Sequence, residues 1–359
     1  MVKIARRLGC MVCAVSLLAG CASDPVRGRL VFGVDAAPEG PRLLWPPPPE
    51  VPRYAYAGTL TGEENFRTDD EARSSAARLL RWIAGLDGPG RDPVVLQRPV
   101  GGMVDERGRI YVTDASRLAV FVFDEREGRL DVWDRAEGLR RFVSPVGVAP
   151  GADGEVLVSD AELGFVARLA ADGTPRGRIG DGALQRPTGL ARDAVAGRLY
   201  VADTTAHDVK VFDDAGRLVT TIGERGEEPG QFNDPTFLSL AGGELYVTDS
   251  VNARVQVFAA GTGRHLRTIG TRGLFVGNLV RPKGVAVDGE RNVYVIESYY
   301  DHMLVYGEDG EFLMPLGGTG SSTGRFFLPA GVWTDERNRV FVADMFNGRV
   351  VVFSFLGGG

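Results

Sequence analysis

The chain has 359 residues, of which 44% are hydrophobic and 25% are charged, and its formal net charge is −6. This composition excludes a low-complexity disordered chain, and the length excludes a small domain that depends on disulfide bonds. Because a single simple core stops growing at about 250–300 residues, the length favours two ordinary domains or one architecture of repeated units.

Residues 1–20 have the pattern of an export signal. Three basic residues precede an apolar stretch, residues 8–18, that is too short to span a bilayer. The Leu-Ala-Gly triplet before Cys21 resembles a bacterial lipobox, and this resemblance implies cleavage before Cys21 and lipidation of its thiol. Because Asp24 is the first acidic residue after Cys21, the resemblance also implies sorting to the outer membrane rather than the inner one.

Removal of this segment changes the charge and the supply of thiols. Loss of its three basic residues takes the net charge from −6 to −9, and no basic cluster remains, so we expect no nucleic-acid partner. Cys10 and Cys13 lie in the removed segment and Cys21 would carry lipid. The mature chain therefore has no free thiol for catalysis or metal binding.

Residues 21–52 are rich in proline and include four consecutive prolines, 46–49. Such sequences favour polyproline II, a stiff extended conformation of about 3.1 Å per residue. We predict a tether that holds the folded part away from the lipid surface, and a ligand for a proline-recognition domain is the alternative interpretation.

Residues 63–95 are predicted to be a helical insertion. Within it, Asp69 or Asp70 can cap a helix that ends near Leu86. The apolar residues of this stretch recur at the i, i+3, i+4 spacing of an amphipathic helix: Ala76, Leu79, Leu80, Ile83 and Leu86.

From residue 96 onward one pattern recurs six times. Each copy contains a proline and, 14 to 16 residues later, a short apolar strand that ends in an acidic residue. The six acidic residues are 46, 43, 46, 48 and 47 positions apart: Asp114, Asp160, Asp203, Asp249, Glu297 and Asp344. Four short strands per copy at this period are typical of a β-propeller blade. We predict an all-β, six-bladed β-propeller over residues 53–359, with blades that begin near residues 96, 139, 183, 232, 279 and 326.

The last copy stops at Phe355 and lacks a fourth strand. Residues 53–62 resemble the outer strand of the other copies. We therefore expect residues 53–62 to pair with residues 350–355 and close the ring, which removes an open sheet edge.

The start of several copies, Pro-x-Gly followed by Val or Leu and Ala, resembles the NHL repeat, as do Leu-Tyr-Val-Ala-Asp and Arg-Val-Gln-Val-Phe. The fourth copy departs from the pattern at 235–239, where Phe237 replaces the glycine. The resemblance implies a six-bladed propeller, but NHL propellers include binding modules, sensors and a few enzymes, so it implies no single activity. Together with the lipobox, it makes the chain similar to bacterial NHL-repeat lipoproteins.

The recurring acidic residues and the histidines are the candidate metal ligands of the chain. An acid that recurs in every blade meets a need of every blade, so we expect the six acids to accept hydrogen bonds from turn amides. The zinc-dependent lyases among NHL propellers hold the metal with several histidines. Of the three histidines here, His207 resembles such a ligand, His265 lies in an outward turn, and His302 would make at most two ligands. Because catalytic zinc generally needs three protein ligands, we predict no metal and no cofactor.

Two sets of residues are candidate binding sites. Arginines immediately precede the blade-opening proline in blades 1, 3 and 5, where they could form a ring that holds an anionic ligand: Arg98, Arg186 and Arg281. The alternative is that each arginine pairs with a nearby acid. Large residues on adjacent loops of blades 5 and 6 are a candidate protein contact: Tyr299, Tyr300, Met345 and Phe346. Burial between the blades is the alternative.

The sequence thus predicts a lipid-anchored, monomeric propeller of the bacterial cell envelope that binds or scaffolds another envelope protein and is not an enzyme. We expect it at the outer membrane, facing the periplasm or the cell surface. The alternatives are a hydrolase or lyase with a metal in the central channel, and a sensor or carrier of an anionic envelope ligand.

Overall fold

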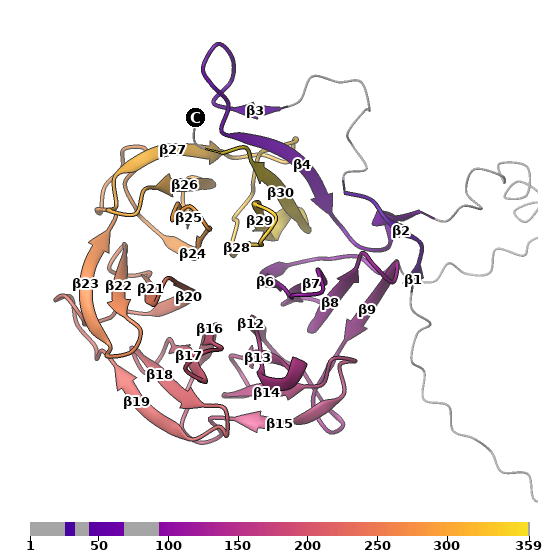
Figure 1. The fold of residues 1–359 in the computed structure, drawn as a ribbon, viewed down its shortest axis with the longest axis vertical. Coiled ribbons are helices and arrows are strands. Elements are labelled where there is room, and N and C mark those ends of the chain that lie inside the picture. Colours follow the sequence, from indigo (N-terminus) through magenta and orange to yellow (C-terminus); the bar gives the residue numbers. More distant parts are fainter. Residues whose placement is uncertain (1–25, 33–42, 68–92, 358–359) are drawn as a thin grey trace, which may run out of the picture.

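The computed structural model describes residues 26–32, 43–67 and 93–357. Six antiparallel β-sheets stand around a central channel, and in each the strands follow one another from the channel outward (Figure 1). This arrangement confirms the all-β, six-bladed propeller. The helices of the described residues are single 3₁₀ turns: η1 (Glu63–Asn65), η3 (Ala152–Gly154) and η4 (Met345–Asn347). The predicted helix between residues 69 and 86 lies outside the described residues.

Blades 1 to 3 follow the predicted order, and a short hairpin of β10 (Arg135–Glu137) and β11 (Arg140–Arg141) lies between blades 1 and 2. From the channel outward their strands are β6 (Pro99–Val104), β7 (Ile110–Asp114), β8 (Ala119–Asp124) and β9 (Arg129–Trp133); β12 (Pro145–Pro150), β13 (Val156–Asp160), β14 (Phe165–Leu169) and β15 (Pro175–Ile179); β16 (Pro187–Asp193), β17 (Arg198–Asp203), β18 (Asp208–Asp213) and β19 (Leu218–Ile222).

Blades 4 and 5 repeat this pattern, and blade 6 has three strands from the C-terminal part of the chain. The strands are β20 (Pro235–Ala241), β21 (Glu244–Asp249), β22 (Arg254–Ala259) and β23 (Arg264–Ile269); β24 (Pro282–Val287), β25 (Val293–Glu297), β26 (His302–Tyr306) and β27 (Phe312–Gly317); β28 (Val332–Thr334), β29 (Arg339–Asp344) and β30 (Arg349–Phe355).

The ring is closed by strand β4 (Tyr54–Leu60), which pairs antiparallel with β30, as the sequence predicts (Figure 1). The register runs from Val350 opposite Leu60 to Phe355 opposite Tyr54. The Tyr54 hydroxyl also lies 3.3 Å from the hydroxyl of Tyr294 in blade 5. The closing strand therefore joins blade 6 to its neighbour as well as completing its sheet.

The described parts of residues 21–52, which the sequence predicts to be a tether, lie against the propeller. Strand β1 (Val26–Arg27) adds a fifth strand to blade 1 by pairing with β9, and β2 (Arg29–Leu30) pairs with β5 (Phe66–Arg67). Strand β3 (Leu44–Trp45) adds a fifth strand to blade 6 by pairing with β4. The physical reason is burial of apolar surface: Leu30 is buried in the core, and the Trp45 ring lies 5.3 Å from that of Phe353.

The glycine of the Pro-x-Gly start is required by the close approach of adjacent inner strands. A Cβ atom on Gly189 would lie 2.6 Å from the Cα of Phe237 in the next blade, and one on Gly284 would lie 2.6 Å from the amide nitrogen of Val332. Real Cβ atoms do not approach backbone so closely, so only glycine fits at these two positions.

An ion-pair cluster ties blade 4 to blade 5. Glu244 accepts hydrogen bonds from Arg267 of the same blade at 2.8 Å and from Arg291 of blade 5 at 2.6 Å. The hydrogen bonds from Arg267 lower the pKa of the Glu244 carboxyl from 4.5 to about 2. Because the folded state holds this carboxylate in its charged form, the cluster stabilises the fold above the unfolded pKa of the carboxyl.

We expect the Glu244→Gln variant to lose about 3 kcal/mol of unfolding free energy at pH 7. The difference from the unmodified protein should shrink as the pH falls from 4.5 toward 2, because protonation of Glu244 removes the same interaction. Urea unfolding at several pH values measures this, with the exposed Glu336→Gln as the control for loss of one surface charge. If the difference in unfolding free energy between Glu244→Gln and the unmodified protein did not change with pH, the ion-pair cluster would not be the source of that stability.

Candidate binding face

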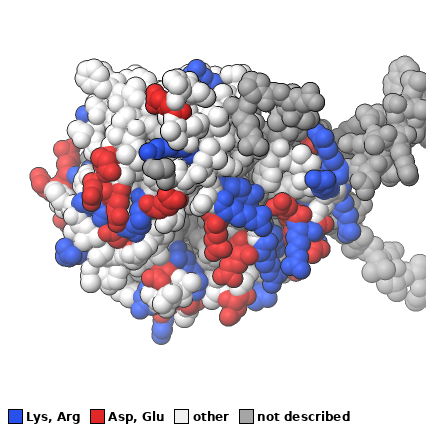
Figure 2. Space-filling view, turned by 45° about the horizontal axis from the view of Figure 1, so that its top comes forward, with Lys and Arg blue, Asp and Glu red and all other residues white. Residues whose placement is uncertain are grey.

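All predicted site residues of the propeller lie on one face, which we call the loop face. It carries the loops that lead from each outer strand into the next inner strand, and the turns that connect the second and third strands of each blade. Figure 2 shows acidic and basic side chains interspersed on the surface in view, beside a broad uncharged area. Among the described residues, no helix has the length and apolar character needed to cross a membrane.

The recurring acids hold these loops in place. Asp114 accepts hydrogen bonds from the amides of Gln97 and Arg98, before the inner strand, at 2.6 and 2.9 Å. It also accepts from Ser116 and Arg117 in the following turn, at 2.9 and 2.8 Å. Equivalent bonds in blades 2 and 5 confirm the structural role that the sequence predicts for these acids.

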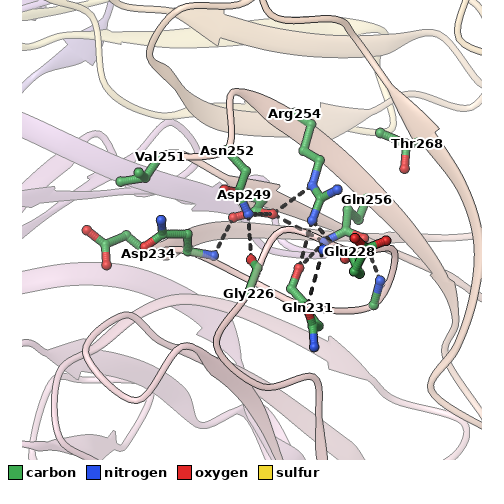
Figure 3. A network of polar contacts seen from close by, with 12 residues as sticks. Gly226, Glu228, Gln231, Asp234, Asp249, Val251, Asn252, Arg254, Gln256 and Thr268 are labelled. Atoms are coloured by element: carbon green, nitrogen blue, oxygen red, sulfur yellow. Dashed lines mark hydrogen bonds and ion pairs between the residues drawn. The ribbon is translucent and has the colours of Figure 1, made fainter.

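In blades 4 and 6 the recurring acidic residue also accepts hydrogen bonds from side chains. The fully buried Asp249 accepts from Arg254 and from Asn252, each at 2.8 Å, and from the amide of Asn233 at 2.7 Å (Figure 3). Burial raises the pKa of the Asp249 carboxyl, and these donors act against that shift. Blade 6 repeats the arrangement with Asp344 at the centre.

In these two blades the residue before the proline is held by the preceding blade. The amide of Asp234 donates to Nδ1 of His207 at 3.2 Å, and the amide of Leu328 donates to Asp301 at 2.7 Å. His207 therefore has a structural contact. His265 instead lies on the outer strand of blade 4, and His302 lies on the third strand of blade 5. Within the described ranges, no three His, Cys, Asp or Glu side chains are grouped so that they could hold a metal ion.

The three candidate arginines have different partners. Arg186 forms an ion pair with Glu162 at 2.8 Å, whereas Arg281 donates to the hydroxyl of Ser298 at 3.1 Å and to its carbonyl at 3.2 Å. The guanidinium of Arg98 lies 5.1 Å from the centre of the Phe346 ring. The alternative of pairing with an acid thus applies to Arg186, and anion binding by the three together stays a prediction.

The predicted contact residues follow the second strands of blades 5 and 6. Tyr299 and Phe346 are exposed, while Tyr300 and Met345 are half-buried. The rings of Tyr299 and Tyr300 lie 4.8 Å apart, edge to face. Phe346 packs against Phe327 at 5.7 Å as well as under Arg98. The aromatics are therefore ordered by neighbouring rings while one edge of the group faces solvent.

Sequence reasoning missed an exposed apolar loop between blades 4 and 5. Leu274, Phe275 and Val276 are 72%, 83% and 64% exposed. The loops that precede blades 4 and 6 are equivalent to it, because each of the three loops contains the same parallel backbone bridge. Between their glycines, these two loops carry polar residues or proline: Glu-Glu-Pro at 227–229 and Ser-Ser-Thr at 321–323. The tip is held by the hydrogen bond from the amide of Asn278 to the carbonyl of Phe275.

The central channel offers little room and few polar side chains. A cavity of about 250 Å³ follows the inner strands and is lined mainly by glycines and apolar side chains. Phe237, in the position that is glycine in the other blades, lies with its ring 3.7 Å from where a Cβ on Gly101 of the opposite blade would stand. The ring of Phe237 therefore crosses the channel and narrows it.

The fold and this face define the protein as a six-bladed β-propeller whose blades are built from one repeat. Two segments, residues 184–212 and 232–258, match the NHL repeat. The chain is therefore a six-bladed β-propeller that contains NHL repeats.

Two curated proteins are similar to part of this chain. The chain is 31% identical over 195 residues to peptidyl-glycine alpha-amidating monooxygenase A of Xenopus laevis, a match that covers 50% of this chain and 19% of that protein. It is 27% identical over 133 residues to the protein brain tumor of Drosophila melanogaster, covering 36% of this chain and 12% of that protein. The chain thus spans less than a fifth of the length of either relative.

Solved structures share the fold at low sequence identity. A virginiamycin B lyase from Staphylococcus aureus is 12% identical with a TM-score of 0.51, over 72% of this chain and 96% of that one. A gluconolactonase from Xanthomonas campestris is 16% identical with a TM-score of 0.55, over 72% and 86%. An auxiliary nutrient binding protein from Bacteroides thetaiotaomicron is 13% identical with a TM-score of 0.56, over 74% and 71%. At these identities the similarity concerns the fold alone.

Proposed function

We propose that this protein is a non-enzymatic binding module of the bacterial cell envelope, anchored to the membrane through lipidated Cys21, which lies outside the described residues. Its partner is another envelope protein, which it binds with the loop face of blades 4 to 6. The observation that supports this most is the ordered, exposed Leu274–Val276 tip, because exposed apolar groups on a rigid support are what protein interfaces bury.

Other exposed apolar residues extend the same surface. They lie on successive loops of blades 4 to 6: Val251, Tyr299, Phe327 and Phe346. Arg272 donates to the carbonyl of Val251, which links the exposed tip to the neighbouring turn of blade 4. Arg98 lies at the far end, over Phe346. Aromatic and arginine side chains are enriched among residues that dominate binding energy, so this composition supports a protein contact.

Photo-crosslinking in intact cells tests this proposal. A photoreactive amino acid placed at Phe275 or Phe346 should give the same discrete crosslinked protein. The matched control is Val195, an apolar residue that is 100% exposed on the opposite face, and it should not give that product. The Phe275→Ser, Val276→Ser double variant should reduce the crosslink from Phe346. Equal crosslinking from Val195 would contradict binding through the loop face.

Hydrolase or lyase chemistry with a metal in the channel is the alternative function. A metal assay on the purified full chain tests it, and one bound zinc or calcium per chain together with turnover of a small molecule would favour that alternative over the proposed one.

A further inference from the structure

Lysine is rare in this chain, and its two described lysines have different surroundings. The sequence contains 38 arginines and three lysines, of which Lys210 and Lys283 lie in the described residues. Lys210 is paired, with its Nζ 2.7 Å from Asp208 and 3.6 Å from Asp203. Lys283 is half-buried, and it makes no hydrogen bond or ion pair with another residue of the described ranges. A half-buried ammonium group without a counter-charge is unfavourable.

The position of Lys283 is not explained by the repeat. It is the middle residue of the Pro-x-Gly start of β24, the innermost strand of blade 5. The equivalent residues of the other five blades are uncharged: Val100, Val146, Thr188, Thr236 and Ala330. A blade can therefore form with a small or apolar residue here, so folding of the blade does not require this charge.

A second cation lies close to Lys283. Arg281 is two residues before it, in the bend that precedes β24, and the guanidinium of Arg281 is held by Ser298. Arg281 and Lys283 both lack a carboxylate partner among the described side chains, although Glu297 lies opposite Pro282 on the neighbouring strand. Glu297 instead accepts hydrogen bonds from the backbone amides of Val280, Arg281 and Tyr299. Burial, together with the charge of Arg281, lowers the pKa of Lys283.

The position of the Phe237 ring shows how deep in the channel Arg281 and Lys283 lie. Phe237, whose ring crosses the channel, occupies in blade 4 the position that Gly284 occupies in blade 5. Lys283 precedes Gly284 and so lies one residue nearer to the loop face. The two cations are thus at the mouth of the channel on the loop face, with the narrowed channel behind them.

We propose that Arg281 and Lys283 form a binding site for one oxyanion, a phosphate or a carboxylate, at the loop-face mouth of the channel. The arginine supplies a fixed planar donor and the lysine a flexible point charge, a combination suited to both oxyanions. An anion there supplies the counter-charge that the protein does not. Because the ring of Phe237 narrows the channel behind, the site takes a terminal anionic group rather than a chain threaded through the ring. This inference goes beyond the proposed protein contact and does not depend on it.

The scarcity of lysine makes a direct test possible. Reductive methylation of the full chain with ¹³C-formaldehyde labels each lysine and keeps its charge, and the variants Lys210→Arg and Lys283→Arg assign the signals. Inorganic phosphate, and separately succinate, should shift the Lys283 signal in a saturable manner and leave the Lys210 signal unchanged. Sodium chloride at matched ionic strength is the control for screening.

Two variants test the geometry of the site. Arg281→Met should weaken anion binding at least about tenfold, since hydrogen bonds to charged groups are the strong ones. Lys283→Met should fold with a melting temperature no lower than that of the unmodified protein, because it removes an unpaired charge. It should also lose the rise in melting temperature that the anion gives the unmodified protein. A response to succinate alone identifies a carboxylate site, and a response to phosphate alone identifies a phosphate site. No saturable shift of Lys283 with either anion, or equal shifts of both lysines, would overturn the proposal.

Discussion

Replacement of Asp249 by alanine should lower the free energy of unfolding by about 3–5 kcal/mol, because it leaves the Arg254 guanidinium without its carboxylate in a nearly buried position. The same change removes the acceptor of the Asn233 amide and of Asn252. Typical domains are stable by about 5–15 kcal/mol, so the loss would be a large part of the total.

Urea unfolding of the purified variant measures this loss, and the exposed Asp309→Ala is the matched control for removal of one carboxylate. The double variant Asp249→Ala, Arg254→Met should recover part of the stability, since it also removes the stranded charge. If Asp249→Ala and Asp309→Ala had equal effects, the network in Figure 3 would not stabilise blade 4.

Replacement of Leu60 by alanine should cost about 2–5 kcal/mol of unfolding free energy, the range for a buried leucine whose removal leaves a cavity. Leu60 is 0% exposed on the closing strand and belongs to the core between blades 6 and 1. Its removal weakens the junction on which closure of the ring depends.

The matched control for this experiment is Val51→Ala, an apolar truncation at a site that is 74% exposed and close in sequence. That variant should change stability by no more than about 0.5 kcal/mol. Limited proteolysis gives a second measurement, since a loosened closing strand should be cut earlier in the Leu60→Ala variant. Similar unfolding curves for the two variants would mean that the junction does not limit stability.

The fold was predictable because the signals that specify it recur. Six acids at a nearly constant spacing give the number of blades, and the missing fourth strand of the last copy shows which segment must complete it. Packing of residues 26–32 and 43–52 on the propeller was not predictable. These segments form pairs of two residues each, which are too short to show a strand periodicity.

The candidate site was predictable in position but not in detail. The sequence places Arg98, Arg186 and Arg281 on one face, but the ion pair of Arg186 with Glu162 joins two blades and has no local signal. Phe237 was visible as a missing glycine, yet its reach across the channel depends on the opposite blade. The Leu274–Val276 tip could have been found by aligning the three glycine-flanked loops, in which it alone is apolar.

The pairing of β4 with β30 joins residues 290 positions apart, from Leu60 to Val350. In blades 1 to 5 the four strands from the innermost outward come from residues close together in the sequence. The final pairing must overcome the entropy of closing a very long loop, so the individual blades can form before it and the ring only after it. The ribosome must therefore release nearly the whole polypeptide before the last junction can form, which leaves an interval during synthesis in which the protein is still unsealed.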